Sequence, residues 1–292
     1  MKLVLTLLCR NEADIIASNI DFHLSRGVDL IIATDNGSTD GTTAILEHYQ
    51  SKGVLQLLHE ASHTHDQEVW VTRMARMAAS EHGADWVINS DADEFWWPRD
   101  AAFKEVLAAV PSEIQALQVH RTNFLPPAAN APSSLPFHQI QIIRESHSFN
   151  SLGHPLPPKV CHRGEAEIVV SDGNHAVQRN GIQVKTLQNT SIEILHFPIR
   201  SFGQLERKIR EGAEALERNT RISPSVGDSW RNLYKNHLLT GQLLDYFARL
   251  RPDSQELSRA LSQGDLIEDL RLQQALKNLV TLNPDSIEAN SL

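Results

Sequence analysis

Asn89-Ser90-Asp91-Ala92-Asp93-Glu94-Phe95 is the stretch that decides the fold, because its acidic residues directly follow an apolar run over residues 86–88. In an extended segment, residues two apart point to the same side, so Asp91 and Asp93 are expected to present both carboxylates just past a buried strand. Such oxygens suit Mn²⁺ or Mg²⁺, which one or two carboxylates commonly hold together with substrate phosphates. A solvated turn after a strand would use the same residues, so the rest of the chain must distinguish the two interpretations.

Strand and helix patterns alternate through the first hundred residues. Apolar strand runs recur, and helical spacing of apolar residues separates them. This order predicts an α/β fold with a mainly parallel sheet flanked by helices. Ligand-binding loops then gather at the carboxyl ends of the strands, and these loops are residues 9–12, 35–41 and 91–94.

Composition narrows the class of protein. The chain has 292 residues, 41% hydrophobic and 22% charged, which is typical of one main globular domain with an extension. A net charge of -9 argues against a general nucleic-acid binder, whose affinity comes largely from Lys and Arg. Two cysteines make no disulfide framework, which favours a cytoplasmic protein. No apolar run approaches the roughly 18 residues of a membrane span, so only peripheral membrane contact is expected.

The second half predicts a different organisation. Residues 101–200 are expected to form an acceptor half, with an irregular binding loop over 123–136 and a strand over 138–144. From residue 202 onward the apolar spacing is helical, and we expect no further strand. The predicted division is therefore a domain over 1–200, whose residues 1–100 bind the donor and metal, and a helical extension over 201–292.

Three motifs in this order resemble one enzyme family. They are Leu7-Leu8-Cys9-Arg10-Asn11-Glu12, Thr34-Asp35-Asn36-Gly37-Ser38-Thr39-Asp40-Gly41-Thr42 and the Asp91 stretch. The set resembles the GT-A glycosyltransferases of family 2 and its close relatives. The resemblance implies a GT-A-type sheet, a nucleoside-diphosphate sugar as donor, Mn²⁺ or Mg²⁺ on the Asp-x-Asp motif, and transfer with inversion at the anomeric carbon.

The resemblance also implies roles for individual residues. Asp93 would bind the metal, and Asp91 would lie near the metal or the donor ribose. Asp35 would contact the base, although an aspartate also suits a turn without any ligand. The remaining donor-binding positions are Arg10, Asn11, Glu12 and Arg73, and for both arginines a solvated surface position is the alternative.

Cationic residues after the last predicted strand point to the same site. His196 ends the apolar run over residues 192–195, where a neutral imidazole can complete a metal site, although a strand-end histidine is often structural. Arg200 and Lys208 follow as candidate partners of the donor diphosphate, because Arg and Lys both bind phosphate.

The general base of the transfer reaction has no clear sequence pattern. Inverting transfer needs a base near the acceptor hydroxyl, usually a carboxylate in this fold. Asp172 is the first candidate, because it follows an apolar strand over 168–170 and precedes a glycine turn. The Glu-Asp motif of many family 2 enzymes is missing there, so Glu94 and Glu145 are alternatives.

Three functions follow from these observations. A metal-dependent glycosyltransferase acting on a saccharide, lipid-linked glycan or protein acceptor is the leading hypothesis. A nucleotidyltransferase is less well supported, because the loop over 9–12 lacks glycine. The third hypothesis is a non-catalytic module that binds nucleotide sugars.

Overall fold

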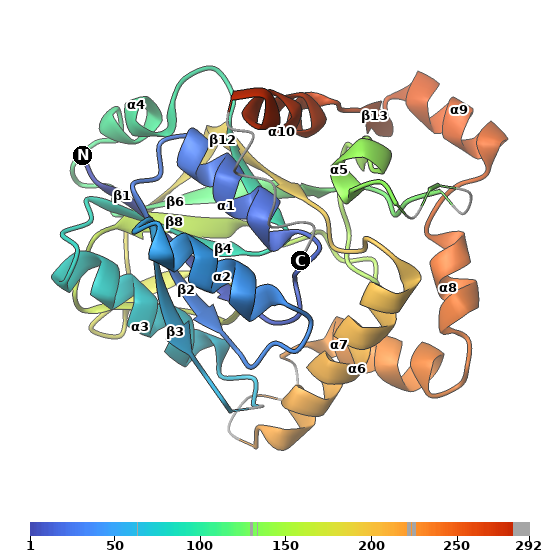
Figure 1. Ribbon diagram of the computed structural model, residues 1–292, viewed down its shortest axis with the longest axis horizontal. Coiled ribbons are helices and arrows are strands. Elements are labelled where there is room, and N and C mark those ends of the chain that lie inside the picture. Colours follow the sequence, from blue (N-terminus) through green and yellow to red (C-terminus); the bar gives the residue numbers. More distant parts are fainter. Residues whose placement is uncertain (63, 129–130, 133, 221–222, 224–225, 283–292) are drawn as a thin grey trace.

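The computed structural model describes residues 1–62, 64–128, 131–132, 134–220, 223 and 226–282. Its centre is an eight-stranded sheet in the order β3-β2-β1-β4-β8-β6-β12-β5 (Figure 1). The bounds are β1 (Leu3–Cys9), β2 (Leu30–Asp35), β3 (Leu55–His59), β4 (Trp86–Asp91), β5 (Glu94–Pro98), β6 (Ala116–Asn123), β8 (Lys159–Arg163) and β12 (Thr186–His196).

The first four strands form the predicted parallel half of the sheet. β1 pairs with β2 and with β4, and β2 pairs with β3, all in parallel. The register sets Cys9 opposite Asp35, and Leu8 opposite Asp91. The carboxyl ends of these strands are therefore level, and the loops that follow them open at one edge. The other half is mixed, since β8 is antiparallel to its neighbours and β5 is antiparallel to β12.

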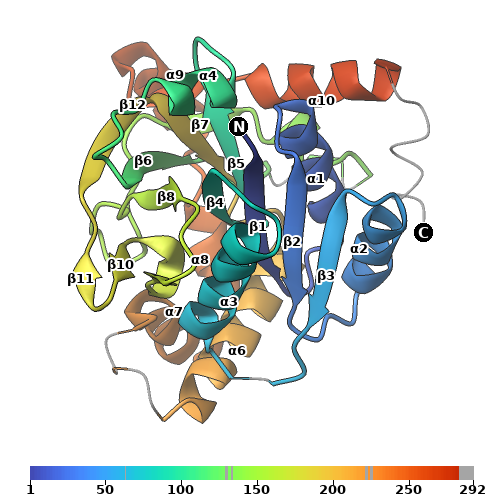
Figure 2. The same ribbon diagram turned by 90° about the vertical axis from the view of Figure 1, so that its left-hand side faces the viewer.

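Helices cover both faces of the sheet (Figure 2). One buried cluster joins strand residues such as Leu5 to residues of α1 (Ile16–Ser25), α2 (Thr42–Ser51) and α10 (Arg271–Leu282). The opposite face, which includes Val4, packs on α3 (Gln67–Ser80) and on a small sheet of β9 (Ile168–Val170), β10 (Val177–Arg179) and β11 (Ile182–Gln183). Successive side chains of β1 therefore point into two different hydrophobic cores, one on each face of the sheet. The predicted α/β class is confirmed.

Two predictions about the second half are wrong. The segment 138–144 is not one strand: it comprises the end of the short helix α5 (Phe137–Ile140) and the start of β7 (Ile143–Glu145). The chain after residue 202 is not purely helical either, because β13 (Leu266–Glu268) pairs antiparallel with β7. A short apolar run can form either a helix or a strand. In both segments the strand forms because β7 and β13, which are distant in sequence, pair with each other.

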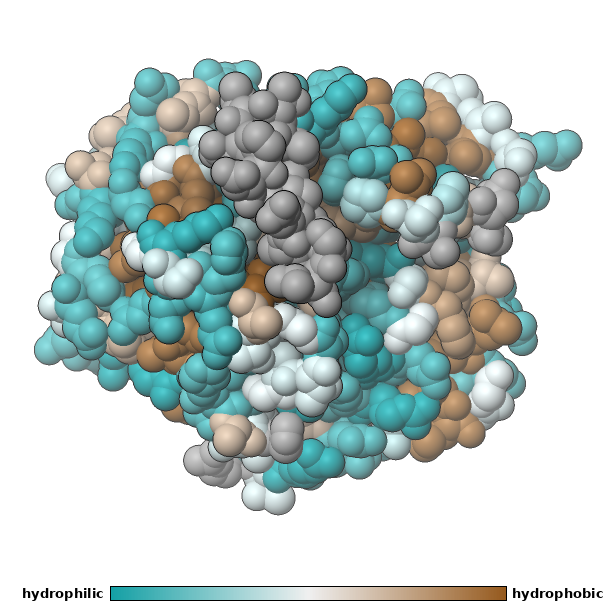
Figure 3. Space-filling model, viewed as in Figure 1, coloured by the Kyte–Doolittle hydropathy of each residue, from teal (hydrophilic) through white to brown (hydrophobic). Residues whose placement is uncertain are grey.

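The remaining elements lie at the periphery. They are α4 (Phe103–Ala108), the 3₁₀ turn η1 (Asp172–Asn174), α6 (Phe202–Arg218), α7 (Asp228–Leu233), the π-helix η2 (Tyr234–Leu238), α8 (Leu243–Arg249) and α9 (Ser254–Gln263). Helices α6 to α8 share a small core of their own, built on Leu205, Ile209, Leu233 and Leu243. Figure 3 shows hydrophobic residues on the side where α8 lies. Leu244 of α8 is 59% exposed, and Leu239, which precedes α8 in the chain, is 62% exposed.

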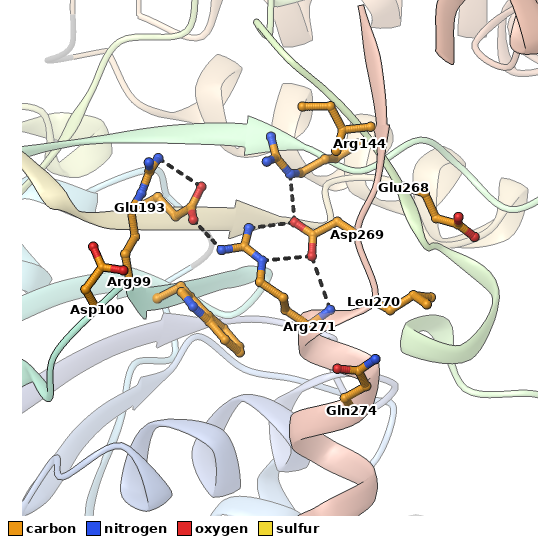
Figure 4. A pocket seen from close by; sticks show the side chains of 11 residues that line it. Arg99, Asp100, Arg144, Glu193, Glu268, Asp269, Leu270, Arg271 and Gln274 are labelled. Carbon is orange, nitrogen blue, oxygen red and sulfur yellow. Dashed lines mark hydrogen bonds and ion pairs between the residues drawn. The ribbon is translucent and has the colours of Figure 1, made fainter. Parts of the chain in front are cut away.

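An ion network ties the C-terminal elements to the sheet (Figure 4). Asp269 accepts from Arg144 Nε at 2.7 Å and from Arg271 Nη2 at 2.6 Å. Glu193 of β12 accepts from Arg271 at 2.5 Å and from Arg99 at 3.2 Å. The five charges are paired with one another, so this network fastens β13 and α10 to the sheet. None of the helices in the described part of the chain has the length and apolar character needed to cross a bilayer.

Candidate functional site

Asp93 is the centre of the candidate site. It follows β4, is only 3% exposed, and pairs through Oδ2 with Lys208 Nζ of α6 at 2.5 Å. Its Oδ1 lies 3.5 Å from Nε2 of His196, the last residue of β12. Burial alone would raise the pKa of this carboxyl, but Lys208 and His196 outweigh it and hold the pKa well below its usual value. Asp93 is therefore an anion that two basic side chains face.

Asp91 lies beside it with a separate partner. Its Oδ2 accepts from Lys159 Nζ at 2.5 Å, and its Oδ1 from Asn174 and Gln67 at 3.3 and 3.4 Å. Burial raises the pKa of Asp91, and Lys159 more than offsets this, so the net shift is downward. The two aspartates thus approach one site from the end of β4, each held by a lysine.

Glu94 begins β5 and is fully buried. Its Oε1 accepts from Lys159 Nζ and from Arg121 Nη1, both at 3.0 Å. Its Oε2 faces the backbone N–H of Asp91 at 3.3 Å. These contacts describe a carboxylate that holds Lys159 and the Asp91 backbone in place, while a role in proton transfer stays a prediction.

The loop after β1 meets helix α6. Arg10 donates through Nε to Glu211 at 2.9 Å and through Nη1 to the carbonyl of Asn36 at 2.5 Å. Asn11 has a positive φ of 54°, which asparagine tolerates better than most residues, and its amide donates to Glu211 at 3.0 Å. The amide oxygen of Asn11 accepts from the backbone N–H of Thr39 at 2.8 Å. The loops after β1 and β2 are thereby joined to α6.

Asp35 orders the loop that follows β2. It is 2% exposed, and its Oδ1 accepts from the backbone and the hydroxyl of Ser38 at 3.0 and 2.6 Å. Its Oδ2 accepts from the Thr43 hydroxyl at 2.5 Å. Both oxygens are engaged within the loop, so the alternative role as a turn residue has structural support, and contact with a base stays a prediction.

Glu12 and the buried Arg200 form an ion pair whose charges both act on Lys208. Arg200 bonds to Glu12 and, through Nε, to Asp14 at 2.6 Å. Burial raises the pKa of Glu12, against the opposing effect of Arg200 and Lys208. Arg200 and Lys208 also lower the pKa of Asp93. The structure therefore brings together Glu12, Asp93, His196, Arg200 and Lys208, although no sequence motif links the last three to Asp93.

Asp172 lies in η1 beside the start of α3. It is partly exposed, and its Oδ1 accepts from the backbone N–H of Glu68 at 3.2 Å. Asp172 and Asp91 both raise the pKa of His65, against the larger lowering that burial causes. Asp172 is thus on the Asp91 side of the site, and its role as base stays a prediction.

Arg73 lies on α3 and its side chain is 42% exposed, with Nη1 4.0 Å from Oε2 of Glu60. The exposure of Arg73 agrees better with the alternative, a solvated surface position, while contact of Arg73 with the donor stays a prediction.

Asp93 and His196 fit a divalent cation. Nδ1 of His196 contacts the amide oxygen of Asn123 at 2.7 Å, and a ring that donates there leaves the Nε2 lone pair toward Asp93. No cluster of three or more His, Cys, Asp or Glu side chains suited to a metal occurs in the described part of the chain. Two protein ligands suffice for an ion that also takes diphosphate oxygens and water.

Sequence reasoning missed four residues of the site. Lys159 and Arg121 come from β8 and β6, Glu211 from α6, and Asn174 from η1. The available signal was weak: Lys159 is a lone charge at the start of an apolar run, and Glu211 follows Lys208 at the i+3 spacing of one helix face. Their partners are set by strand and helix packing and have no local pattern.

Three solved structures are similar to the chain at low sequence identity. TarS of S. aureus (residues 1–349, in complex with UDP) is 14% identical, over 100% of this chain and 87% of that one, with a TM-score of 0.39. The mannosyltransferase PcManGT from Pyrobaculum calidifontis, in complex with GDP-Man and Mn²⁺, is 13% identical over 98% and 88%, with a TM-score of 0.41. Glucosyl-3-phosphoglycerate synthase from Mycobacterium tuberculosis, in complex with Mn²⁺, UDP and glucosyl-3-phosphoglycerate, is 20% identical over 41% of this chain and 44% of that one, with a TM-score of 0.29.

Comparison of the sequence with family models identifies the family of the chain. No curated protein sequence matches the chain. The model of glycosyltransferase family 92 matches residues 8–226, which include the second and third motifs, the first motif except Leu7, and helix α6. The resemblance to glycosyltransferases is confirmed, and the matching family is 92, whereas the motifs suggest family 2 or a close relative. The match also favours the glycosyltransferase hypothesis over the nucleotidyltransferase and the non-catalytic module. The chain belongs to glycosyltransferase family 92, and it is an enzyme of the glycosyltransferase class.

Proposed function

We propose that the protein transfers a sugar from a nucleoside-diphosphate sugar to an acceptor hydroxyl, with inversion at the anomeric carbon and with Mn²⁺ or Mg²⁺. The observation that carries the proposal is the grouping of Asp93, His196 and Lys208 at the carboxyl edge of the parallel strands. A carboxylate and an imidazole face each other there at 3.5 Å, and an ammonium group lies 2.5 Å from the same carboxylate. Ligands of open α/β sheets bind at this edge.

Asp93 and His196 would hold the cation, with Asp91 close by. A bound Mn²⁺ or Mg²⁺ ion supplies electrostatic neutralisation of the leaving nucleoside diphosphate. The chain itself adds Lys208, whose ammonium group can exchange Asp93 for a phosphate oxygen. Arg200 adds positive charge near Asp93 without a direct contact to it, because its guanidinium is held by ion pairs with Glu12 and Asp14.

The acceptor hydroxyl would lose its proton to a carboxylate. In this step the acceptor oxygen bonds to the anomeric carbon, the bond from that carbon to the diphosphate oxygen breaks, and Asp172 takes the proton. Asp172 suits this role because it is partly exposed on the Asp91 side of the site. Glu94 is fully buried between Lys159 and Arg121, which suits a role in positioning the motif.

Calorimetry with UDP, GDP and dTDP, each with and without Mn²⁺, tests the proposal. We expect one nucleotide to bind the wild type far more tightly with Mn²⁺, and Asp93→Asn to abolish that metal-dependent gain. Asp100→Asn, an exposed position after β5, is the matched control and should retain it. Unchanged Mn²⁺-dependent affinity in Asp93→Asn would contradict the metal assignment. Hydrolysis assays with the corresponding nucleotide sugars then identify the donor.

A further inference from the structure

Helix α6 presents two faces to different parts of the protein. Its apolar residues Leu205 and Ile209 form a small cluster with Leu233 of α7 and Leu243 of α8, and these three helices lie together beside the sheet (Figure 1). Among the described residues, this cluster includes none that belong to the two cores of the sheet. The apolar face of α6 therefore packs on α7 and α8, and a different face meets the candidate site.

The face of α6 at the candidate site carries a cation and an anion three residues apart. Residues at this spacing lie on one side of a helix. Lys208 Nζ lies 2.5 Å from Asp93 Oδ2. Glu211 Oε2 accepts from Arg10 Nε at 2.9 Å and from the Asn11 amide at 3.0 Å. One turn of α6 thus sets an ammonium group on the acidic motif and a carboxylate on the loop after β1.

Arg10 and Asn11 lie where a donor is expected to bind. They follow β1, whose end is level with the ends of β2 and β4, and ligands of open α/β sheets bind at this edge. A guanidinium and an amide N–H₂ group both donate hydrogen bonds, which suits the oxygens of a nucleoside diphosphate. Glu211 engages both groups with one carboxylate. The side chains of Arg10 and Glu211 are 27% and 31% exposed, so a ligand has access to this pair.

We propose that Glu211 determines donor affinity by competing with the nucleotide for Arg10 and Asn11. The inference rests on the proposed function, because it requires a nucleoside-diphosphate donor at this edge. A diphosphate is negative, so it can take over Lys208 from Asp93 but must displace the carboxylate of Glu211 from Arg10. The two residues of one helix turn therefore act in opposite directions: Lys208 strengthens donor binding, and Glu211 weakens it.

A purely structural role of Glu211 predicts the opposite sign. If Glu211 only held Arg10 and Asn11 in place, loss of its charge would loosen both side chains and weaken nucleotide binding. If Glu211 competes with the nucleotide, the same loss strengthens nucleotide binding. Glu211→Gln separates the two roles, because it keeps the size of the side chain and an oxygen for the Asn11 amide but removes the negative charge.

Calorimetry with UDP, GDP and dTDP measures this sign. We expect Glu211→Gln to bind its preferred nucleotide about 10-fold more tightly than the wild type, which is the lower value of a charge-assisted hydrogen bond. Glu214→Gln is the matched control, because Glu214 lies on the same helix, is 42% exposed and pairs with Arg218. Its affinity should equal that of the wild type. Weaker or unchanged binding by Glu211→Gln would overturn the inference.

A second background locates the effect at Arg10. Arg10→Gln removes the charged group for which Glu211 and the nucleotide compete, so the addition of Glu211→Gln should give a gain far below 10-fold, since residues in contact have non-additive effects. An undiminished gain in this background would assign the effect to overall charge and contradict the inference.

Titrations with and without Mn²⁺ distinguish this inference from the proposed function. A gain in Glu211→Gln at both conditions supports competition, even if Mn²⁺ changes no affinity, which is the result that contradicts the metal assignment. Mn²⁺-dependent binding by the wild type without a gain in Glu211→Gln overturns the role of Glu211 and leaves the proposed function intact. Absence of nucleotide binding in both proteins overturns both.

Discussion

Lys208 Nζ lies 2.5 Å from Asp93 Oδ2, which joins the first helix after the sheet to the acidic motif 115 residues earlier in the chain. Burial lowers the pKa of this lysine, but Asp93 and Glu12 outweigh it and raise the pKa above its usual value. Lys208 is therefore charged at neutral pH. Helix α6 thus contributes a residue to the candidate site, although it lies beyond the predicted domain boundary at residue 200.

Replacement of Lys208 should weaken nucleotide binding. Lys208→Met removes one charge-assisted hydrogen bond to the diphosphate, which is worth about 1.5–3 kcal/mol, or about 10- to 100-fold in Kd. The control is Arg210→Met on the same helix, where the side chain is 48% exposed and pairs with Glu206. Calorimetry with nucleoside diphosphate and Mn²⁺ measures both, and equal affinities would remove Lys208 from the site.

Asp172→Asn should lose transfer while it keeps donor binding. The substitution preserves the oxygen that accepts from the Glu68 backbone but removes the ability to take a proton. Loss of a general base typically lowers the rate by about 10²- to 10⁴-fold. Asp245→Asn on exposed α8 is the control. Near-normal transfer by Asp172→Asn, in an assay with a nucleotide sugar and acceptor, would direct attention to Glu145.

Lys159 should matter more for stability than a surface lysine. Its side chain is 1% exposed and pairs with Asp91 and Glu94, so Lys159→Met leaves Asp91 without its cation and Glu94 with Arg121 but without its lysine. Breaking a buried pair in this way costs about 3–5 kcal/mol. Lys104→Met, which removes an exposed pair with Asp29, should cost no more than about 1 kcal/mol. Urea unfolding followed by tryptophan fluorescence compares the two, and equal losses would contradict the prediction.

His23 should make the folded protein sensitive to mild acid. Its Nδ1 faces the carbonyl of Asn19 at 2.8 Å, and its Nε2 accepts from the Trp96 backbone at 3.2 Å. A second ring proton would oppose that N–H, and burial lowers the pKa of His23 to about 4.

The sign of this effect follows from proton linkage. The unfolded chain has a histidine pKa of about 6.5, so it binds more protons than the folded state between about pH 6.5 and 4. The stabilisation is complete above about pH 6.5 and declines as the pH falls through this window. His23→Gln should make the pH dependence of the unfolding free energy shallower there, by up to about 1.4 kcal/mol per pH unit. Unfolding curves at several pH values test this, and identical slopes would contradict it.

The sequence by itself determined the parallel half of the fold and the place of the acidic motif. The alternating strands and helices predict β1 to β4, and the apolar run over residues 86–88 predicts that Asp91 and Asp93 lie at their carboxyl edge, because these patterns are local. In the structure Asp91 ends β4 and Asp93 lies in the turn that follows it. The sequence also predicted that His196, Arg200 and Lys208 lie near that edge, since His196 ends a strand there and the other two follow it in the chain.

Only the tertiary structure decided the partners. Lys159 reaches Asp91 because β8 runs antiparallel to β4, and Asn123 reaches His196 because β6 and β12 pair in a particular register. The short run 266–268 also becomes a strand through a distant partner, because it pairs antiparallel with β7 in a two-stranded sheet. Contacts between distant segments depend on packing and register, which leave no periodic signal in either segment.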